Sequence, residues 1–159
     1  MPTPPRAAWL TLLVSNSRIE IAGRQHTIAT RTTFSGPRGN WHRYGFLDTT
    51  EVWLEVALRQ RGGEVVAYSS SLEGVHPTGV PNFDQPSPIR WGGVDYFPHG
   101  RNTLAYRTSA GYEGTVRYVS YARARRSQTT RLRLEQFDGG RWTVVKPRLI
   151  SPDEISAVL

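Results

Sequence analysis

The chain has 159 residues, a formal net charge of +7 and no cysteine. This length fits a single domain, and the lack of cysteine excludes disulfides, thiol nucleophiles and cysteine-ligated metal sites. The apolar run 7–14 is too short for a transmembrane helix and is not typical of a signal peptide. We therefore expect it to form an opening strand or short helix on the core of a cytoplasmic protein, which could also lie peripherally at a membrane.

The rest of the pattern predicts β-strands, because apolar and polar residues alternate with a period of two. Two strand-like segments come first, at 18–21 and 25–33. Three pairs of segments follow, each with a glycine turn between its members: 51–56 and 64–68 flank Arg61-Gly62-Gly63, 104–109 and 115–121 flank Gly111 and Gly114, and 130–137 and 141–146 flank Asp138-Gly139-Gly140. Asp-Gly supplies the positive φ angles of a tight hairpin. Leucines and arginines alternate over 130–134, which predicts a sheet with one face on the core and one in water.

Only the C-terminal end has a helical pattern. Ser151, Pro152 and Glu154 provide an N-cap serine, a proline at the first helical position and a glutamate three residues after the cap. We expect a short structural helix that runs through Leu159 and lies across the sheet.

Prolines and an internal similarity indicate how the strands are grouped. Residues 73–93 contain four prolines, which cannot donate to a strand ladder, so we expect a long irregular loop there. On either side, Ala29-Thr30-Arg31-Thr32 resembles Ala105-Tyr106-Arg107-Thr108, and Arg43-Tyr44 resembles Arg117-Tyr118. The prediction is one mostly β domain over 1–159, an antiparallel barrel or sandwich of two related meanders (about 18–72 and 94–150) with a short C-terminal helix.

Positive charge is concentrated in the last third of the chain. Residues 101–148 hold eleven basic side chains against three acidic ones, whereas the rest holds nine against ten. Five arginines crowd together there: Arg123, Arg125, Arg126, Arg131 and Arg133. This asymmetry favours an anionic partner.

The sequence gives little support to catalysis. It contains no Gly-x-Ser-x-Gly elbow, P-loop or His-x-x-x-His pair, and its four histidines are far apart. Glu51 and Glu55 share one face of a strand, and Glu135 lies in the corresponding strand of the second half, but we interpret them as the wet face of a sheet and not as a glycosidase-like pair. No catalytic residue, metal site or cofactor is expected.

Tyr118 and Tyr121 are interleaved with Arg123 and Arg125. Aromatic rings can stack on bases while guanidinium groups meet phosphates, so this arrangement is compatible with single-stranded nucleic acid. Tyrosines are also ordinary cross-strand partners within sheets.

Several motifs occur in a recognisable order over roughly 10–155. They are Arg18 to Gly23, Tyr44, Trp53-Leu54, Tyr118-x-x-Tyr121, Leu132-x-Leu134-Glu135, Phe137-Asp138-Gly139-Gly140 and Trp142. The order resembles a family of bacterial β-rich domains catalogued as domain of unknown function 4178 (DUF4178). The chain departs from the pattern at Gly45, where an unbroken aromatic-rich strand is expected. The resemblance implies a β-rich fold and transfers no catalytic residue.

Together these observations predict a non-catalytic interaction module. Its expected contact face consists of Arg123, Arg125, Arg126, Arg131 and Arg133, with Tyr118 and Tyr121 nearby. The expected partner is an acidic protein or the headgroups of a membrane. The alternatives are a nucleic acid bound to the same face, and an enzyme of unrecognised type.

Overall fold

The computed structural model describes residues 6–37, 39–58, 64–71, 82–124 and 127–159, apart from the side chains of 124 and 127–130. Its strands are β1 (Arg18–Ile21), β2 (Arg24–Gly36), β3 (Gly39–Phe46), β4 (Val52–Leu58), β5 (Glu64–Ser71), β6 (Ile89–Trp91), β7 (Val94–Thr108), β8 (Glu113–Ala124), β9 (Ser127–Phe137), β10 (Trp142–Lys146) and β11 (Ile155–Ala157). Two short 3-10 helices, η1 (Ala8–Leu12) and η2 (Pro152–Glu154), lie near the ends.

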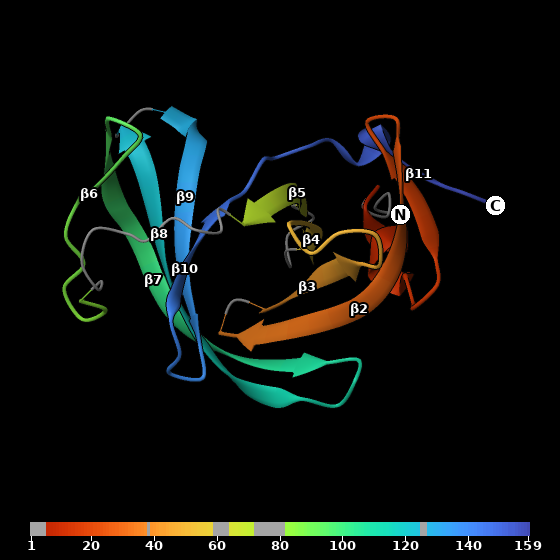
Figure 1. Cartoon of the computed structure of the whole chain (residues 1–159), viewed down its shortest axis with the longest axis horizontal. Coiled ribbons are helices and arrows are strands. Elements are labelled where there is room, and N and C mark those ends of the chain that lie inside the picture. The colour runs from red at the N-terminus through yellow and green to blue at the C-terminus, as the bar shows by residue number, and fades with distance from the viewer. Residues whose placement is uncertain (1–5, 38, 59–63, 72–81, 125–126) are drawn as a thin grey trace, which may run out of the picture.

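The eleven strands form one antiparallel sheet in the order β11-β1-β2-β3-β4-β5-β10-β9-β8-β7-β6. Consecutive strands β1 to β5 form a first meander, and β6 to β10 form a second, joined where β5 pairs with β10. β2 also pairs with β7, so the strands from β2 to β7 in this order close into a ring (Figure 1). The prediction of a mostly β, antiparallel fold is confirmed, whereas the origin of the two meanders by duplication stays a prediction.

The strand turns follow from local sequence. At the hairpin between β9 and β10, Asp138 and Gly139 both have positive φ, 51° and 73°, as the Asp-Gly pattern predicts. The Asp138 carboxylate accepts hydrogen bonds from the Tyr106 hydroxyl and the Thr115 backbone N–H. A Cβ at Gly114 would collide with this carboxylate, which explains why the neighbouring strand carries a glycine there.

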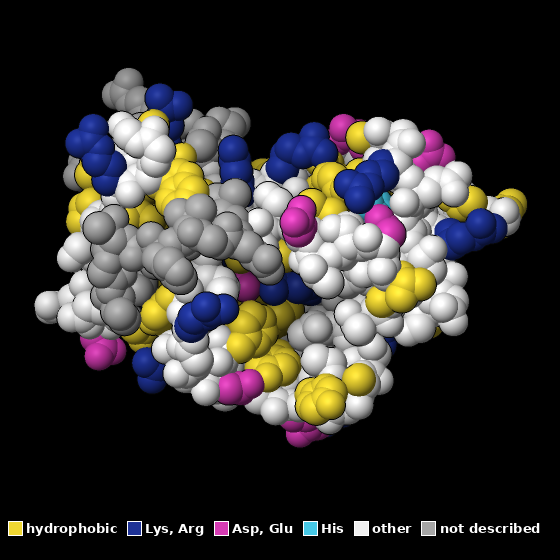
Figure 2. Space-filling view, viewed as in Figure 1, with side chains coloured by type: hydrophobic (Ala, Val, Ile, Leu, Met, Phe, Trp, Pro, Cys, Tyr) yellow, Lys and Arg dark blue, Asp and Glu magenta, His cyan; other side chains and the backbone are white. Residues whose placement is uncertain are grey.

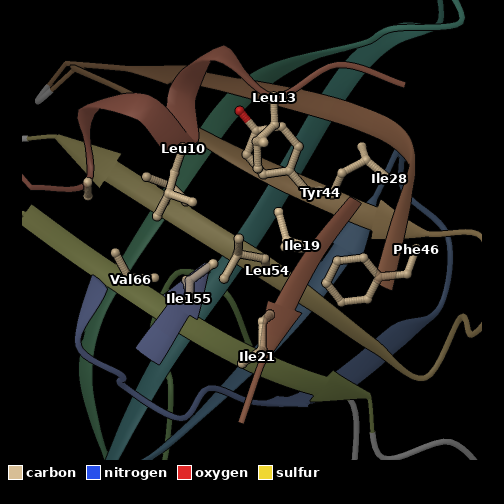
Figure 3. Close-up of a cluster of buried hydrophobic side chains, with 12 residues drawn as sticks. Leu10, Leu13, Ile19, Ile21, Ile28, Tyr44, Phe46, Leu54, Val66 and Ile155 are labelled. Atoms are coloured by element: carbon tan, nitrogen blue, oxygen red, sulfur yellow. The ribbon is translucent and has the colours of Figure 1, made fainter. Parts of the chain in front are cut away.

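The outer face of β3, β4 and β5 is covered by η1, β1 and β11. Leu10 and Leu13 at the N-terminal end, Ile19 and Ile21 of β1, and Ile155 of β11 converge on Tyr44, Leu54 and Val66 (Figure 3). The expectation of a short N-terminal element on the core is confirmed by η1, in which Leu10 is fully buried.

The second meander has its own apolar cluster. Tyr96, Val119, Tyr121, Leu132, Leu134 and Val144 are buried, with Phe83, Ile89 and Trp91 packed against them. Of the irregular loop expected over 73–93, residues 73–81 lie outside the described part of the chain. Residues 89–91 form β6 and pair with β7. Regular strand structure therefore begins at residue 89, inside the range that the prolines predicted to be a loop.

The predicted C-terminal helix is wrong. Ser151 and Glu154 do form a capping box, but it caps only the single turn η2. The chain then becomes extended, because pairing of β11 with β1 satisfies the edge of β1 and buries Ile155. None of the helical turns in the described ranges has the length and hydrophobicity needed to span a bilayer.

This assignment of the C-terminus predicts the effect of Ile155→Ala. Loss of the buried side chain should lower the free energy of unfolding by about 2–5 kcal/mol. Ser156→Ala, at the exposed neighbouring position, should change it by no more than about 0.5 kcal/mol. Urea denaturation of both variants tests the point, and equal stability would contradict the placement of β11 on the core.

Candidate ligand-binding site inside the ring

Four charged side chains meet inside the ring. Arg43 and Glu55 are register partners on β3 and β4, and Arg133 and Glu135 lie two residues apart on β9. Because alternate residues of a strand point to opposite faces, these positions lie on the sides of the two meanders that face away from their apolar clusters. We call the four residues the charge cluster.

Both arginines of the charge cluster contact both carboxylates. Arg43 Nη2 lies 2.5 Å from Glu135 Oε1 and 3.3 Å from Glu55 Oε1. Arg133 Nε lies 2.8 Å from Glu135 Oε1, and its Nη2 donates to Glu55 Oε1. Two of these four ion pairs, Arg43–Glu55 and Arg133–Glu135, lie within one meander. The other two, Arg43–Glu135 and Arg133–Glu55, cross the ring and join the two meanders.

The cluster is buried and remains charged. Glu55 and Glu135 are only 7 % and 3 % exposed. Burial alone would raise the pKa of Glu135, but Arg43 and Arg133 outweigh it and hold that pKa below its usual value. Burial would likewise lower the pKa of Arg133, but Glu55 and Glu135 raise it instead. The positive and negative charges cancel within the cluster.

Aromatic side chains hold the cluster in place. Trp53 Nε1 donates a 2.8 Å hydrogen bond to Glu55 Oε1. The Arg43 guanidinium carbon lies 4.7 Å from the Trp53 ring centroid, and that of Arg133 lies 5.4 Å from the Trp41 centroid. These are cation–π distances, so the guanidinium groups are fixed both by carboxylates and by aromatic rings.

Two adjoining pockets lie beside the charge cluster, between the meanders. The aromatic pocket, about 200 Å³, is walled by Trp41, Tyr118 and Ala57, and the arginine pocket, about 130 Å³, by Arg131, Leu132, Pro147 and Leu149. Both are also lined by Glu55, Val65, Ala67, Ser120 and Arg133. In the space-filling view a hollow separates the two halves of the molecule, with basic and hydrophobic side chains at its floor (Figure 2).

Arg131 differs from the arginines of the charge cluster because its guanidinium forms no ion pair among the described residues. Its Nε is buried and has no hydrogen-bond partner; the same is true of Arg43 Nε, but the Arg43 guanidinium is held by two carboxylates through Nη2. Its register partner is Ala122, which places it on the same side of the sheet as Arg133. A buried donor without an acceptor is unfavourable, so the arginine pocket presents an unmet hydrogen-bond donor.

The five arginines predicted to form one face do not do so. Arg123 is exposed and lies at the irregularity of β8 between Ala122 and Ala124, and it does not line the pockets that contain Arg131 and Arg133. Arg133 is not on a wet face at all, because its guanidinium is occupied in the charge cluster. Arg125 and Arg126 lie outside the described residues.

The two tyrosines are also separated. Tyr118 lines the aromatic pocket, whereas Tyr121 is 1 % exposed and belongs to the outer apolar cluster of the second meander. The interpretation of Glu55 and Glu135 as a wet face is wrong, because both carboxylates are buried against arginines. Glu51 is exposed.

Sequence reasoning missed Arg43 and the cross-ring pairing. A signal was present in the spacing: Arg133-x-Glu135 puts opposite charges on one face of a strand, and Trp53-x-Glu55 puts an indole donor beside a carboxylate. A face on which opposite charges are matched is suited to burial, whereas charges of one sign are not.

A second buried polar group lies away from the ring interior. His26 Nδ1 is 3.1 Å from Asp48 Oδ2, its Nε2 is 2.9 Å from the Tyr68 hydroxyl, and its ring stacks on Phe46 at 4.0 Å. Both ring nitrogens are engaged, so His26 ties β2 to β5 and to the loop after β3. Among the described residues, no group of three or more His, Asp or Glu side chains is arranged to hold a metal ion.

These features define the class of fold as an antiparallel β ring whose two halves each have an outer apolar cluster. The halves share an interior that holds the charge cluster and, packed against it, a third apolar cluster around Phe34, Leu104 and Val116. The chain belongs to the DUF4178 family, described as a domain of unknown function, whose model matches residues 16–152. The resemblance inferred from the sequence is thereby confirmed. Neither a curated protein nor a solved structure matches the chain.

The charge cluster predicts a large contrast between two glutamates of the same segment. Glu55→Gln leaves two buried guanidinium groups short of one negative charge and should lower the free energy of unfolding by about 3 kcal/mol. Glu51→Gln, at the exposed position, should change it by no more than about 0.5 kcal/mol. Chemical denaturation at pH 7 measures both, and a cost for Glu55→Gln as small as that for Glu51→Gln would rule out a structural role for the cluster.

A pH dependence follows from the lowered pKa of Glu135. The pKa of this carboxyl group is lower in the folded state than its unfolded-state pKa of about 4.3. Its contribution to the free energy of unfolding is therefore complete above about pH 4.3 and is lost as the pH falls through the folded-state pKa. The stability difference between the wild type and Glu135→Gln should therefore shrink as the pH falls below about 4.3. Urea titrations of both proteins test this, and a difference that stays constant from neutral to acidic pH contradicts it.

Proposed function

We propose that the domain is a non-catalytic binding module that takes an anionic ligand into the interior of the ring. The observation that carries this proposal is the buried Nε of Arg131, which lines the arginine pocket without an acceptor. A guanidinium group can bind both oxygens of a carboxylate or two oxygens of a phosphate in parallel.

Electrostatics supports a ligand of negative charge. The four members of the charge cluster carry two positive and two negative charges, so they contribute no net charge to the pockets. Arg131 then leaves the interior with one uncompensated positive charge. An anion in the arginine pocket would balance it and would supply the missing hydrogen-bond acceptor.

The buried carboxylates favour binding over catalysis. A general acid needs a carboxyl group whose pKa is raised towards neutrality. Glu135 has the opposite shift, because two guanidinium groups stabilise its ionised form. The lowered pKa and the paired guanidinium groups are typical of a structural ion cluster. They therefore favour a binding module over the enzyme alternative.

The macromolecular partners expected from the sequence remain proposals with less support. An acidic protein, a membrane surface or a nucleic acid would need a continuous basic face, but Arg123 is exposed whereas Arg131 lines the arginine pocket and Arg133 is paired with two carboxylates. Nucleic-acid stacking would also need both tyrosines exposed, and Tyr121 is buried. A bacterial origin and a cytoplasmic or membrane-peripheral location likewise remain proposals.

Arg131→Gln tests the proposed site, with Arg123→Gln as a matched control that removes an exposed arginine outside both pockets. Acetate and inorganic phosphate serve as separate probes in two-dimensional amide NMR titrations at constant ionic strength. At least one probe should cause saturable shifts at Ser120, Arg131 and Arg133 in the wild type and in Arg123→Gln. The same shifts should be absent in Arg131→Gln.

The outcomes separate the candidates. Equal responses in Arg131→Gln and the wild type, or no saturable response to either anion in the wild type, would overturn the proposal. Fluorescence anisotropy with short single-stranded DNA supplies the nucleic-acid comparison. Tight binding that weakens between about 50 and 200 mM salt and survives Arg131→Gln would favour the nucleic-acid alternative instead.

A further inference from the structure

We propose that the ligand of the ring interior is a small monocarboxylate with an apolar body, preferably a single aromatic ring. This inference rests on the proposed function and specifies its ligand. It comes from the opposite character of the two pockets and from the number of charges around them.

The aromatic pocket suits an uncharged ring. Trp41 and Tyr118 provide aromatic walls, and Ala57, Val65 and Ala67 provide small apolar surfaces from the first meander. Its volume is about 200 Å³, and an apolar cavity of about 150 Å³ is enough to bind benzene. The pocket therefore has room for one six-membered ring or a short alkyl chain.

The arginine pocket suits the charged end of the same molecule. It is smaller, about 130 Å³, and it contributes the Arg131 guanidinium and the Ser120 hydroxyl. Because Val65, Ala67 and Ser120 line both pockets, one ligand can place its body in the first and its head in the second. A carboxylate then accepts from Arg131, and Ser120 can donate to it as well.

The charge count favours a monoanion over a dianion. Of the two arginines that line the pockets, Arg133 is paired with Glu55 and Glu135, whereas Arg131 has no carboxylate partner among the described residues. Glu55 lines both pockets and keeps its negative charge close to the binding site. A second negative charge on the ligand would face this carboxylate without a cation of its own, so a phosphate dianion is a poorer match than a carboxylate.

The test uses 3-phenylpropionate as the probe in isothermal titration calorimetry. Acetate supplies the charge without the ring, and 3-phenylpropanol supplies the ring without the charge. We expect 3-phenylpropionate to bind the wild-type chain at least tenfold more tightly than acetate, phosphate or the alcohol. Arg131→Gln should weaken this binding at least tenfold, and Arg123→Gln should leave it unchanged.

A second variant probes the aromatic pocket independently of charge. Ala57 lines the aromatic pocket but not the arginine pocket. Ala57→Phe therefore places a ring in the aromatic pocket alone, and it should weaken the binding of 3-phenylpropionate at least tenfold while preserving the acetate response seen by NMR. Circular dichroism confirms that each variant is folded. The same affinity for 3-phenylpropionate in Ala57→Phe and the wild type would overturn the assignment of the aromatic pocket.

The failures of the two proposals are distinguishable. If acetate or phosphate acts at Arg131 but 3-phenylpropionate binds no more tightly than acetate, the proposed function stands and this inference fails. Tighter binding of phosphate than of 3-phenylpropionate overturns the inference that the ligand is a monoanion. If no anion produces a response that depends on Arg131, both proposals fail.

Discussion

The ion pairs that cross the ring are the interaction on which the rest of the structure depends. Glu55 of the first meander binds Arg133 of the second, and Arg43 of the first binds Glu135 of the second. Backbone pairing between the meanders is short: β5 and β10 share two register pairs, and β2 and β7 share four. The charge cluster therefore adds a side-chain link in the space between the two backbone seams.

The same cluster determines what the interior can bind. Two arginines are neutralised by two carboxylates, so neither is available to a ligand without loss of a buried pair. Arg131 lies two residues before Arg133 on the same side of β9 but has no such partner among the described residues. Two arginines of one strand thus have different roles: Arg133, which is paired with carboxylates, is structural, and Arg131, which is not, is available to bind a ligand.

The regular parts of the fold could be predicted from the sequence. Alternation of leucine and arginine located β9, and Asp138-Gly139 located its hairpin, because both features act between near neighbours. The C-terminus was not predictable in this way. The capping box at Ser151 is real, but pairing of β11 with β1, far away in the sequence, decides that the chain is extended after one turn.

The candidate site was harder to predict for the same reason. Period-two alternation shows that Arg133 and Glu135 share a face, but not whether that face meets water or another strand. Only closure of the ring brings Arg43 and Glu55 opposite them and turns an expected wet face into a buried one. Arg131 and Arg123 were grouped because they are near in sequence, although Arg131 lines the arginine pocket and Arg123 is exposed outside it.

Two of the three apolar clusters lie outside the ring, and their placement has a consequence for how the domain can change over time. Each meander buries its own cluster, one beneath η1, β1 and β11 and the other beneath β6 and Phe83. The pocket positions Val65, Ala67 and Ser120 belong to neither cluster. Substitutions there can alter the shape of the interior while both cores are retained, so one scaffold can diversify its ligand without first being rebuilt.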